Sequence, residues 1–365
     1  MFDGRAFRLG RLFGIRIGVD PSWFLVFAFI TWSIAGGFAQ QHTSWSAAGV
    51  WTAAVSASLI FFASILLHEL GHSLTSILLR VPVRSITLFL FGGVAELAAE
   101  PRRARDEFLI AIAGPATSLL LALAFGVLWL SVGGDHPVAV VAGWLAGVNL
   151  GVGVFNMLPG FPLDGGRVLR AALWGATGDL TRATRWAGRV GMVVGAGFVT
   201  LGAAIAVGTG NLFYGLFLGF MGWFLVRSAR QHVALSVRSD RLSRIRAGDA
   251  VRARAGRTVD AWATLEDVAE ELAVSGCLLV EQDGEVAGFL GAACLEQVPP
   301  PRRAYHQVRQ EMTPLSGLLP IDAGASLLAA LKTMDRQRVD ALAVLEGGHL
   351  QGVLTRLDLL RVLRA

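Results

Sequence analysis

LLHELGHSLTSILL, residues 66–79, places two histidines and a glutamate in a run that is otherwise apolar enough for the interior of a membrane. A charged side chain at the centre of a bilayer costs about 2.5–3.5 kcal/mol on insertion scales, so such residues are usually kept for a function. His68 and His72 are four residues apart, so on a helix they share one face. We therefore expect a functional site inside a membrane-spanning helix.

The rest of the chain has the composition of a polytopic α-helical membrane protein. Of its 365 residues, 54% are hydrophobic and only 16% are charged, whereas about a quarter of the residues are charged in an ordinary soluble domain. Six apolar segments have about the 20 residues that cross a bilayer. We predict that these segments are membrane-spanning helices: 21–40, 47–79, 108–132, 137–158, 186–207 and 211–227.

Arginine is distributed unevenly among the segments that join the predicted spans. The connections 41–46, 133–136 and 208–210 contain neither lysine nor arginine, whereas the N-terminal segment 1–20 and the loops 80–107 and 159–185 each contain several arginines. The positive-inside rule then places the N-terminus and the arginine-bearing loops in the cytoplasm. We expect a multi-pass protein of the cell membrane, with the lipid bilayer as its surroundings. Its arginines lie beside the spans, so nucleic-acid binding is not expected.

The composition changes after the sixth predicted span. Residues 228–245 are polar and basic and indicate a linker or a surface helix, and from residue 246 the pattern is that of a soluble α/β domain. Residues 246–303 and 304–365 repeat one order of elements: an amphipathic helix, a short apolar strand, a turn, a second strand and a helix. We predict a pseudo-symmetric pair after a membrane domain at 21–227. This pair is cytoplasmic if the positive-inside assignment holds.

The histidine and glutamate spacing is that of the helix of zinc peptidases. Two imidazoles on one helix face can hold a metal ion, and Glu69, which is not needed as a ligand, can take a proton from metal-bound water. The alternative is a pair of histidines hydrogen-bonded to neighbouring groups. That alternative has little weight in an apolar span, because uncompensated polar groups are costly there.

A catalytic zinc ion needs a third protein ligand. In FNMLPGFPLDGGRVLRAAL, residues 155–173, prolines and glycines stop the fourth span and let Asp164 turn toward the second span. Asp164 could equally cap the helix that follows it, and the spacing alone does not decide between the two roles. The remaining histidines lie in loops, the linker or the tail, and are less well placed: His42, His136, His232, His306 and His349.

The two motifs together resemble those of the site-2 protease family of intramembrane zinc metalloproteases, peptidase family M50. The resemblance rests on HELGH at 68–72 and on the stretch from Asn156 to Arg167, and it covers roughly residues 10–230. It implies one zinc ion per chain and a short membrane-embedded β element. It also implies a role for each motif residue: His68, His72 and Asp164 as zinc ligands, Glu69 as the catalytic acid/base, and Asn156 as a group that holds the substrate or the developing oxyanion.

A glycine-broken stretch, ITLFLFGGVAELAAE at 86–100, is too short for a span. In the family the equivalent stretch is β-structure whose edge strand pairs with unwound substrate, a form of β-augmentation. The resemblance therefore implies that substrate binds along one run of this stretch: Gly92, Gly93, Val94, Ala95, Glu96 and Leu97. The alternative is a cytoplasmic surface hairpin.

The third predicted span contains AIAGPATSLL, which resembles the Gly-Pro element of the family at Gly114-Pro115. The family has asparagine three residues after that proline, where this chain has Ser118. This departure bears on a supporting hydrogen bond and not on the zinc site. In the fourth span, Asn149 lies in apolar sequence, and we expect it to form a hydrogen bond between helices.

The C-terminal pair resembles a tandem CBS-domain pair. GVLTRLDLL, residues 352–360, is similar to the pattern with which such domains bind the ribose of an adenine nucleotide, and the resemblance implies Thr355 and Asp358 as the contacts. The first repeat has GFLGAACLEQV in the corresponding place and lacks both residues. The alternative is a module for dimerisation or scaffolding, and we expect a homodimer formed through this pair.

The sequence predicts a zinc metalloendopeptidase that hydrolyses peptide bonds within or near the transmembrane segment of single-span membrane proteins. This reaction is regulated intramembrane proteolysis, and the CBS pair is expected to regulate it or to form the dimer. One alternative is a metal or solute transporter that uses the same ligands, although transporters typically show inverted repeats that the two halves here lack. The other is an inactive adaptor that senses a nucleotide. The presence of every expected zinc and base residue argues against the adaptor.

Overall fold

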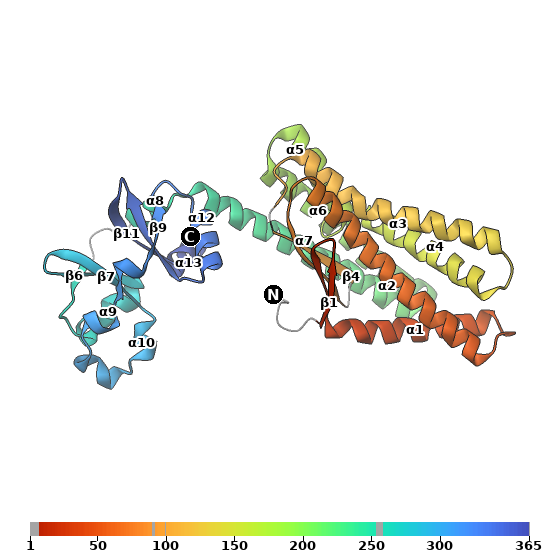
Figure 1. Cartoon of the computed structure of the whole chain (residues 1–365), viewed down its shortest axis with the longest axis horizontal. Coiled ribbons are helices and arrows are strands. Elements are labelled where there is room, and N and C mark those ends of the chain that lie inside the picture. The colour runs from red at the N-terminus through yellow and green to blue at the C-terminus, as the bar shows by residue number, and fades with distance from the viewer. Residues whose placement is uncertain (1–6, 90–91, 99, 253–257, 365) are drawn as a thin grey trace. The chain divides into compact units, whose positions relative to one another are not determined.

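The structure is a computed structural model that describes residues 7–89, 92–98, 100–252 and 258–364 (Figure 1). The chain divides into two compact units, Met1–Ala234 and Leu235–Ala365. The first unit holds the long helices and a small sheet, and the second unit is α/β.

Six helices in the described residues are long and apolar enough to cross a membrane, which confirms the six predicted spans. They are α1 (Pro21–Gln41), α2 (Ala47–Leu78), α3 (Ala104–Val132), α4 (Pro137–Asn156), α6 (Leu180–Thr209) and α7 (Leu212–Arg244). A shorter helix, α5 (Asp164–Thr177), lies between α4 and α6 in the chain. Helix α7 continues through the stretch expected to be a linker or surface helix, since residues 228–244 contain neither glycine nor proline to end it.

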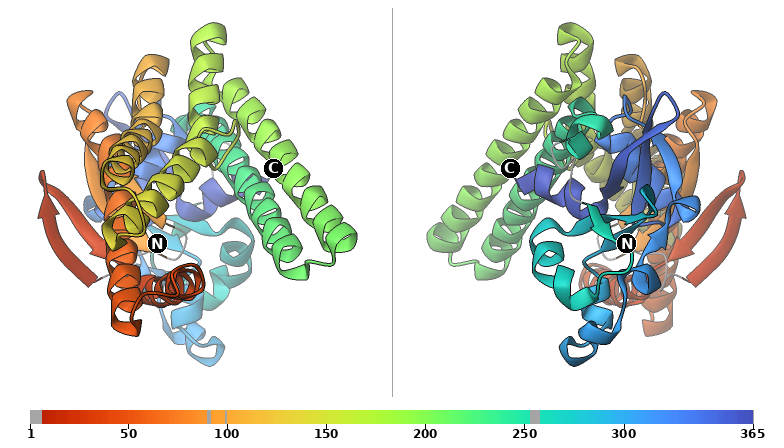
Figure 2. Two further views of the ribbon diagram at one scale, coloured as in Figure 1. Left: turned by 90° about the vertical axis from the view of Figure 1, so that its right-hand side faces the viewer. Right: turned by 90° about the vertical axis from the view of Figure 1, so that its left-hand side faces the viewer.

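Small residues set the spacing of the helices in the first unit. α1, α2 and α4 share a core in which Ala53, Ala54 and Ala57 of α2 are buried. α6 and α7 form an antiparallel pair (Figure 2), and a Cβ atom on Gly195 of α6 would lie 2.8 Å from the carbonyl oxygen of Gly222 of α7. Asn149 of α4 donates a hydrogen bond to Ser64 Oγ of α2 at 3.4 Å, as the sequence predicts.

A four-stranded sheet packs against the C-terminal half of α2. Its strands are β1 (Phe7–Leu12), β2 (Ile15–Val19), β3 (Val83–Phe89) and β4 (Gly92–Leu97), in the order β1-β2-β3-β4. β2 and β3 are parallel, and the other two pairs are antiparallel. Ile15, Ile17 and Ile86 are buried against Leu70 of α2, one residue from Glu69. The hairpin at 86–100 is therefore part of a larger sheet, whose strands β1 and β2 come from the segment predicted only as an N-terminal extension.

The second unit contains two sheets, one from each predicted repeat. The first has the order β5-β6-β7-β8 and the second the order β11-β10-β9. The first-repeat elements are β5 (Thr258–Asp260), α9 (Leu265–Ser275), β6 (Cys277–Gln282), β7 (Glu285–Gly291) and α10 (Cys294–Gln297). The corresponding second-repeat elements are β9 (Leu319–Asp322), α12 (Leu327–Gln337), β10 (Ala341–Glu346), β11 (His349–Thr355) and α13 (Arg356–Arg364).

The two cores of this unit do not follow the sequence boundary at 303/304. Helix α8 (Ala247–Arg252) contributes Ala247 and Val251 to the core of the second repeat. Conversely, α11 (Val308–Glu311) contributes Val308 to the core of the first repeat, and β8 (Thr313–Pro314) pairs with β7. Each repeat is thus completed by the segment that precedes the other repeat, which explains why neither forms a closed unit from its own 60 residues.

Candidate metal centre

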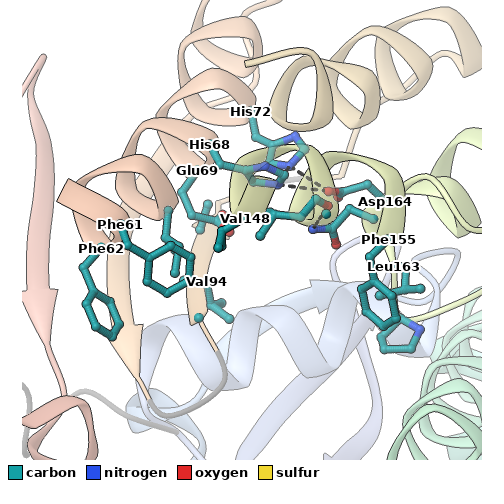
Figure 3. Close-up of a pocket in the computed structure, with 18 of the residues that line it drawn as sticks. Phe61, Phe62, His68, Glu69, His72, Val94, Val148, Phe155, Leu163 and Asp164 are labelled. Atoms are coloured by element: carbon teal, nitrogen blue, oxygen red, sulfur yellow. Dashed lines mark hydrogen bonds and ion pairs between the residues drawn. The ribbon is translucent and has the colours of Figure 1, made fainter. Parts of the chain in front are cut away.

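Three polar side chains converge between α2 and the start of α5 (Figure 3). His68 Nε2 and His72 Nε2 lie 3.2 Å apart, and Asp164 Oδ2 lies 3.2 Å from each of them. Both histidines are buried, with 5% of their surface exposed. In the described part of the chain this is the one group of three or more metal-ligating side chains with this spacing.

The donor atoms fit a zinc ion. Ligands bound tetrahedrally at 2.0–2.1 Å are separated by about 3.3–3.4 Å, close to the 3.2 Å seen for all three pairs. The Nδ1 atom of His72 is 2.6 Å from the carbonyl oxygen of Ile110, which can only accept a hydrogen bond. The proton of His72 is therefore on Nδ1, and the lone pair of Nε2 faces the other two ligands.

Ser118 of α3 supports the other histidine. Its Oγ atom lies 2.9 Å from Nδ1 of His68, and the serine is 1% exposed. At the position where the family has asparagine, serine thus still provides a polar partner for the ligand. A hydrogen-bonding partner on the ring nitrogen that faces away from the metal fixes the ring orientation of a ligating histidine.

The segment between α4 and α5 brings Asp164 to the histidines. Pro159 and Pro162 fall in the irregular turn after α4, and α5 begins at Asp164. A Cβ atom on Gly165 would lie 2.3 Å from the carbonyl oxygen of Leu158, so the turn is packed too closely for a side chain there. Leu163, not Asp164, is the N-cap residue of α5. The contacts of Asp164 with the histidines favour the ligand role over the capping role.

Gly114 leaves room for the ligand atoms. A Cβ atom at this position would lie 2.2 Å from Nε2 of His72 and 2.6 Å from Nε2 of His68. Gly114 is buried in α3 directly before Pro115. The glycine of the Gly-Pro element therefore packs directly against the ligand atoms, a role that the sequence alone did not reveal.

Glu69 lies beside this cluster and against the sheet (Figure 3). It is not a member of the ligand group. A Cβ atom on Gly93 of β4 would lie 2.5 Å from Cγ and 3.3 Å from Oε1 of Glu69. Strand β4 thus passes directly over the glutamate side chain, and only glycine fits at the point of contact.

The cluster opens into a cavity of about 1030 Å³ whose lining is mostly apolar. Its walls come from β4 and from the helices α1, α2, α3, α4, α5 and α7, and they include Glu69 and Asn156. The side-chain amide of Asn156 donates to the carbonyl oxygen of Val152 at 3.0 Å. Of the six residues predicted to bind substrate, five line the cavity: Gly92, Gly93, Val94, Ala95 and Leu97. Glu96 does not, and its carboxylate lies 3.3 Å from Arg84.

Thr355 and Asp358 lie in the second unit, where β11 meets α13. Asp358 Oδ2 accepts hydrogen bonds from the backbone N–H of Thr355 at 2.9 Å and from its hydroxyl at 2.8 Å. Both side chains are buried. The structure brings these two residues together, and their mutual bonds are those of a pair that begins a helix.

Two further contacts near the site were not predicted from the sequence. Glu107 of α3 is 1% exposed and accepts a hydrogen bond from Arg170 Nε of α5 at 2.7 Å. The Arg170 guanidinium also lies over the ring of Phe161, which stacks on His232 of α7. Glu107 sits just before the predicted start of the third span, and a glutamate in that place is the signal that could have identified a buried ion pair.

Two buried histidines and a partly exposed carboxylate, with a further carboxylate beside them and membrane-length helices around them, are the arrangement expected of a membrane-embedded metallohydrolase. Comparison with known proteins agrees. Residues 56–141 and 134–198 match Peptidase family M50, and residues 308–365 match the CBS domain. A Mycobacterium tuberculosis protein named "Putative zinc metalloprotease Rip3" is 35% identical over 367 residues, which cover 98% of this chain and 93% of the relative.

A Synechocystis protein named "Putative zinc metalloprotease sll0528" is 31% identical over 374 residues, which cover 100% of this chain and 97% of the relative. The solved structure titled "Site-2 Protease from Methanocaldococcus jannaschii" is 26% identical, with a TM-score of 0.42, over 62% of this chain and 95% of that one. The chain belongs to peptidase family M50, the site-2 protease family, and is a zinc metalloprotease with a C-terminal CBS pair. Family membership favours the protease over the transporter and the adaptor.

Proposed function

We propose that this protease hydrolyses peptide bonds within or next to the transmembrane segment of single-span membrane proteins. The observation that carries the proposal is the position of the three ligand atoms and Glu69 in one apolar cavity walled by membrane-length helices. An apolar chain segment loses little by leaving lipid for such a cavity, whereas a polar soluble peptide would have to be desolvated.

In the proposed mechanism His68, His72 and Asp164 hold the zinc ion. When bound, zinc supplies a Lewis acid and lowers the pKa of a coordinated water molecule. Glu69, one residue from a ligand, accepts the proton of the attacking water and returns it to the leaving amine. The amide of Asn156, in the same cavity, donates to the substrate carbonyl or to the oxyanion that develops from it.

Strand β4 is proposed to hold the substrate in an extended conformation. Among the described strands β4 pairs with β3 alone, so its other edge can accept a further strand. Gly93 lies against Glu69, and a segment paired along β4 would pass close to the proposed base. Unwinding the substrate helix in this way would expose its carbonyl groups to attack.

The zinc content of the purified protein tests the ligand assignment. We expect about one zinc ion per chain in the unsubstituted protein and a sharply lower zinc content in Asp164→Ala. Glu69→Gln should keep zinc and lose turnover, since the amide cannot accept the proton. Unchanged zinc in Asp164→Ala would show that the third ligand is wrong, and near-normal turnover of Glu69→Gln would exclude its role as base. The zinc-loaded Glu69→Gln variant would also serve to trap and identify substrates.

The N-terminus and the second unit are proposed to lie in the cytoplasm of a cell whose plasma or inner membrane holds the protein. The arginine bias of the loops supports this orientation. Single cysteines placed at His136 and at His349 distinguish the two sides in intact cells. A membrane-impermeant thiol reagent should label position 136, in the α3–α4 connection, and should not label position 349, the exposed first residue of β11 in the second unit. The opposite pattern would reverse the assignment.

The CBS pair is proposed to regulate the protease or to form a homodimer, with an adenine nucleotide as the candidate ligand near Thr355 and Asp358. The buried mutual hydrogen bonds of these two residues mean that a nucleotide would have to compete with them. Titration of the full chain with ATP, AMP and adenosine tests binding. If no nucleotide binds saturably, dimerisation is the remaining proposed role of the CBS pair. The mass of the protein in nanodiscs shows directly whether it is a dimer.

A further inference from the structure

The hairpin of β1 and β2 carries an unusual surface. Every residue of β1 is exposed, while Ile15, Ile17 and Val19 of β2 are buried. Four large apolar side chains of the hairpin are among the exposed ones: Phe7 (58%), Leu9 (67%), Leu12 (44%) and Phe13 (72%). An edge strand with such a surface invites aggregation in water. In the native surroundings these side chains therefore require a partner.

The strand register places Phe7 and Leu12 on one face of the hairpin and the arginines on the other. Leu9 falls at the register shift between Arg8 and Gly10, and Phe13 lies in the turn. Phe7 is opposite Val19 and Leu12 is opposite Ile15, so these side chains share the face that turns toward α2. On the other face, Arg8 is opposite Gly18 and Arg11 is opposite Arg16. All three arginines are exposed, and within the described residues no carboxylate forms an ion pair with any of them. The hairpin thus has the two-sided pattern of a segment that lies flat in a membrane interface.

The apolar face of the hairpin continues onto a membrane-length helix. The ring of Phe7 lies 6.0 Å from that of Phe24, edge to face. Phe24 and Leu25 are 53% and 73% exposed near the start of α1, which is a candidate membrane span. Figure 1 shows β1 beside the beginning of α1, and Figure 2 shows the hairpin projecting from the helices of the first unit. The exposed surface of the hairpin therefore meets the lipid-facing surface of α1 at the end of the span.

The depth of the hairpin follows from its backbone. Among the described strands β1 pairs with β2 alone. The N–H and C=O groups along its other edge would find no hydrogen-bonding partner in the hydrocarbon core, which excludes the hairpin from that layer. The interfacial layer supplies both water for that edge and an apolar boundary for the side chains.

We propose that the hairpin Phe7–Val19 binds the membrane interface and selects anionic phospholipid headgroups. Its apolar side chains, with Leu9 and Phe13 the most exposed, enter the acyl boundary, and Arg8, Arg11 and Arg16 bind the phosphate layer. β1 is joined through β2 and β3 to β4, the strand that contacts Glu69. This anchor therefore sets the depth of β4 in the membrane. That consequence for the substrate strand rests on the proposed function, whereas the lipid contact itself does not.

Full-length protein in lipid nanodiscs tests the proposal without any activity measurement. Both native cysteines are replaced by alanine, and an environment-sensitive fluorophore is attached at Phe13→Cys, at Leu9→Cys or, as a water-exposed reference, at His349→Cys. In nanodiscs that contain phosphatidylglycerol, the labels at 9 and 13 should be protected from iodide and quenched by spin-labelled lipid. The label at 349 should be quenched by iodide and should not be quenched by spin-labelled lipid.

Charge variants decide whether the lipid headgroup matters. Neutralisation of the three arginines in R8Q/R11Q/R16Q should shift the ratio of docked to undocked hairpin by roughly a hundredfold in phosphatidylglycerol nanodiscs. The R8K/R11K/R16K variant should remain docked, which distinguishes lost charge from a misfolded hairpin. The proposal is overturned if positions 9 and 13 are as accessible to iodide as position 349. It is also overturned if docking is equal in purely zwitterionic nanodiscs, or if the glutamine variant docks like the parent.

Discussion

The Cβ atom that Gly114 lacks would lie 2.2 Å from Nε2 of His72, closer than any non-bonded atom can approach. Replacement by alanine must therefore displace the ligand rings, because the methyl group would be fixed to the backbone of α3 at a buried position. We predict that Gly114→Ala loses most of its zinc and most of its activity. Metal analysis of the purified variant measures the first, and cleavage of a membrane substrate measures the second.

Gly126→Ala is the matched control for this substitution. Gly126 lies on the same helix, and a Cβ atom there would meet nothing within 4 Å. Alanine also favours a helix over glycine by about 1 kcal/mol. This control should keep its zinc and be at least as stable as the parent. Full zinc occupancy in Gly114→Ala would contradict the ligand geometry.

Gly93→Ala should separate catalysis from metal binding. The new Cβ atom would lie 2.5 Å from Cγ of Glu69 and not against any zinc ligand. We expect normal zinc content and a turnover lower by about a hundredfold, the effect of displacing a catalytic group by about 1 Å. Gly147→Ala on α4, where the added Cβ atom meets nothing, is the control. Equal turnover of the two variants would contradict the close contact between β4 and the proposed base.

Ser118→Ala removes the hydroxyl that lies 2.9 Å from Nδ1 of His68. The buried imidazole then lacks its partner, and mutation of such a partner typically weakens metal binding 10- to 100-fold. Competition with a chelator of known zinc affinity measures this change. Ser131→Ala on the same helix is the control, since Ser131 is exposed and donates only to Val127 one turn earlier. Equal zinc affinities in the two variants would exclude the supporting role.

The span pattern of the fold was predictable from the sequence, since a bilayer requires runs of about 20 apolar residues whatever they pack against. The sequence also placed His68 and His72 on one helix face, because they are four residues apart, and it placed Glu69 next to that pair. Asp164 was different. It is 96 residues from His68, and the spacing alone did not decide whether it binds the metal or caps a helix. The structure places it at the start of α5, one residue after the N-cap residue.

What the sequence did not reveal depends on contacts between distant segments. Strand β2 pairs with β3 across more than 60 residues, and β1 joins the sheet only through β2. Although Ile15, Ile17 and Val19 alternate, a run of five residues is too short to be distinguished from a basic N-terminal tail. The role of Gly114 was hidden for a similar reason. A glycine that makes room for a neighbouring helix looks, in sequence, like any other glycine in a membrane span.

In the second unit, the two cysteines should differ in reactivity. Burial, and to a lesser degree the carboxylate of Glu311, raises the pKa of the Cys294 thiol above its ordinary value. A raised thiol pKa lowers the thiolate fraction at any given pH, and the thiolate is the species that reacts. At pH 8 we expect iodoacetamide to alkylate Cys294 more slowly than the partly exposed Cys277. Mass spectrometry of the two peptides measures both rates, and equal rates in native protein would contradict the prediction.

The ion pair of Glu107 and Arg170 should hold the ligand-bearing helix α5 in place. Arg170 is on α5, six residues after Asp164, and its guanidinium donates to a carboxylate of α3 that is 1% exposed. Removal of one partner leaves the other charge buried without compensation, which costs 3–5 kcal/mol for a fully buried pair. Since 19% of the Arg170 side chain is exposed, we expect Glu107→Gln to lower the free energy of unfolding by about 2–3 kcal/mol.

Unfolding of the full chain by denaturant in mild micelles measures this change, and zinc release from the folded state measures its effect on Asp164. Arg182→Gln is the control, because Arg182 and Asp179 form a pair with side chains 77% and 39% exposed, and such pairs contribute less than about 1 kcal/mol. The double variant Glu107→Gln/Arg170→Gln should cost less than the sum of its two single variants, as coupled partners do. Additive costs, or zinc release as slow in Glu107→Gln as in Arg182→Gln, would mean that α5 is positioned by its packing alone.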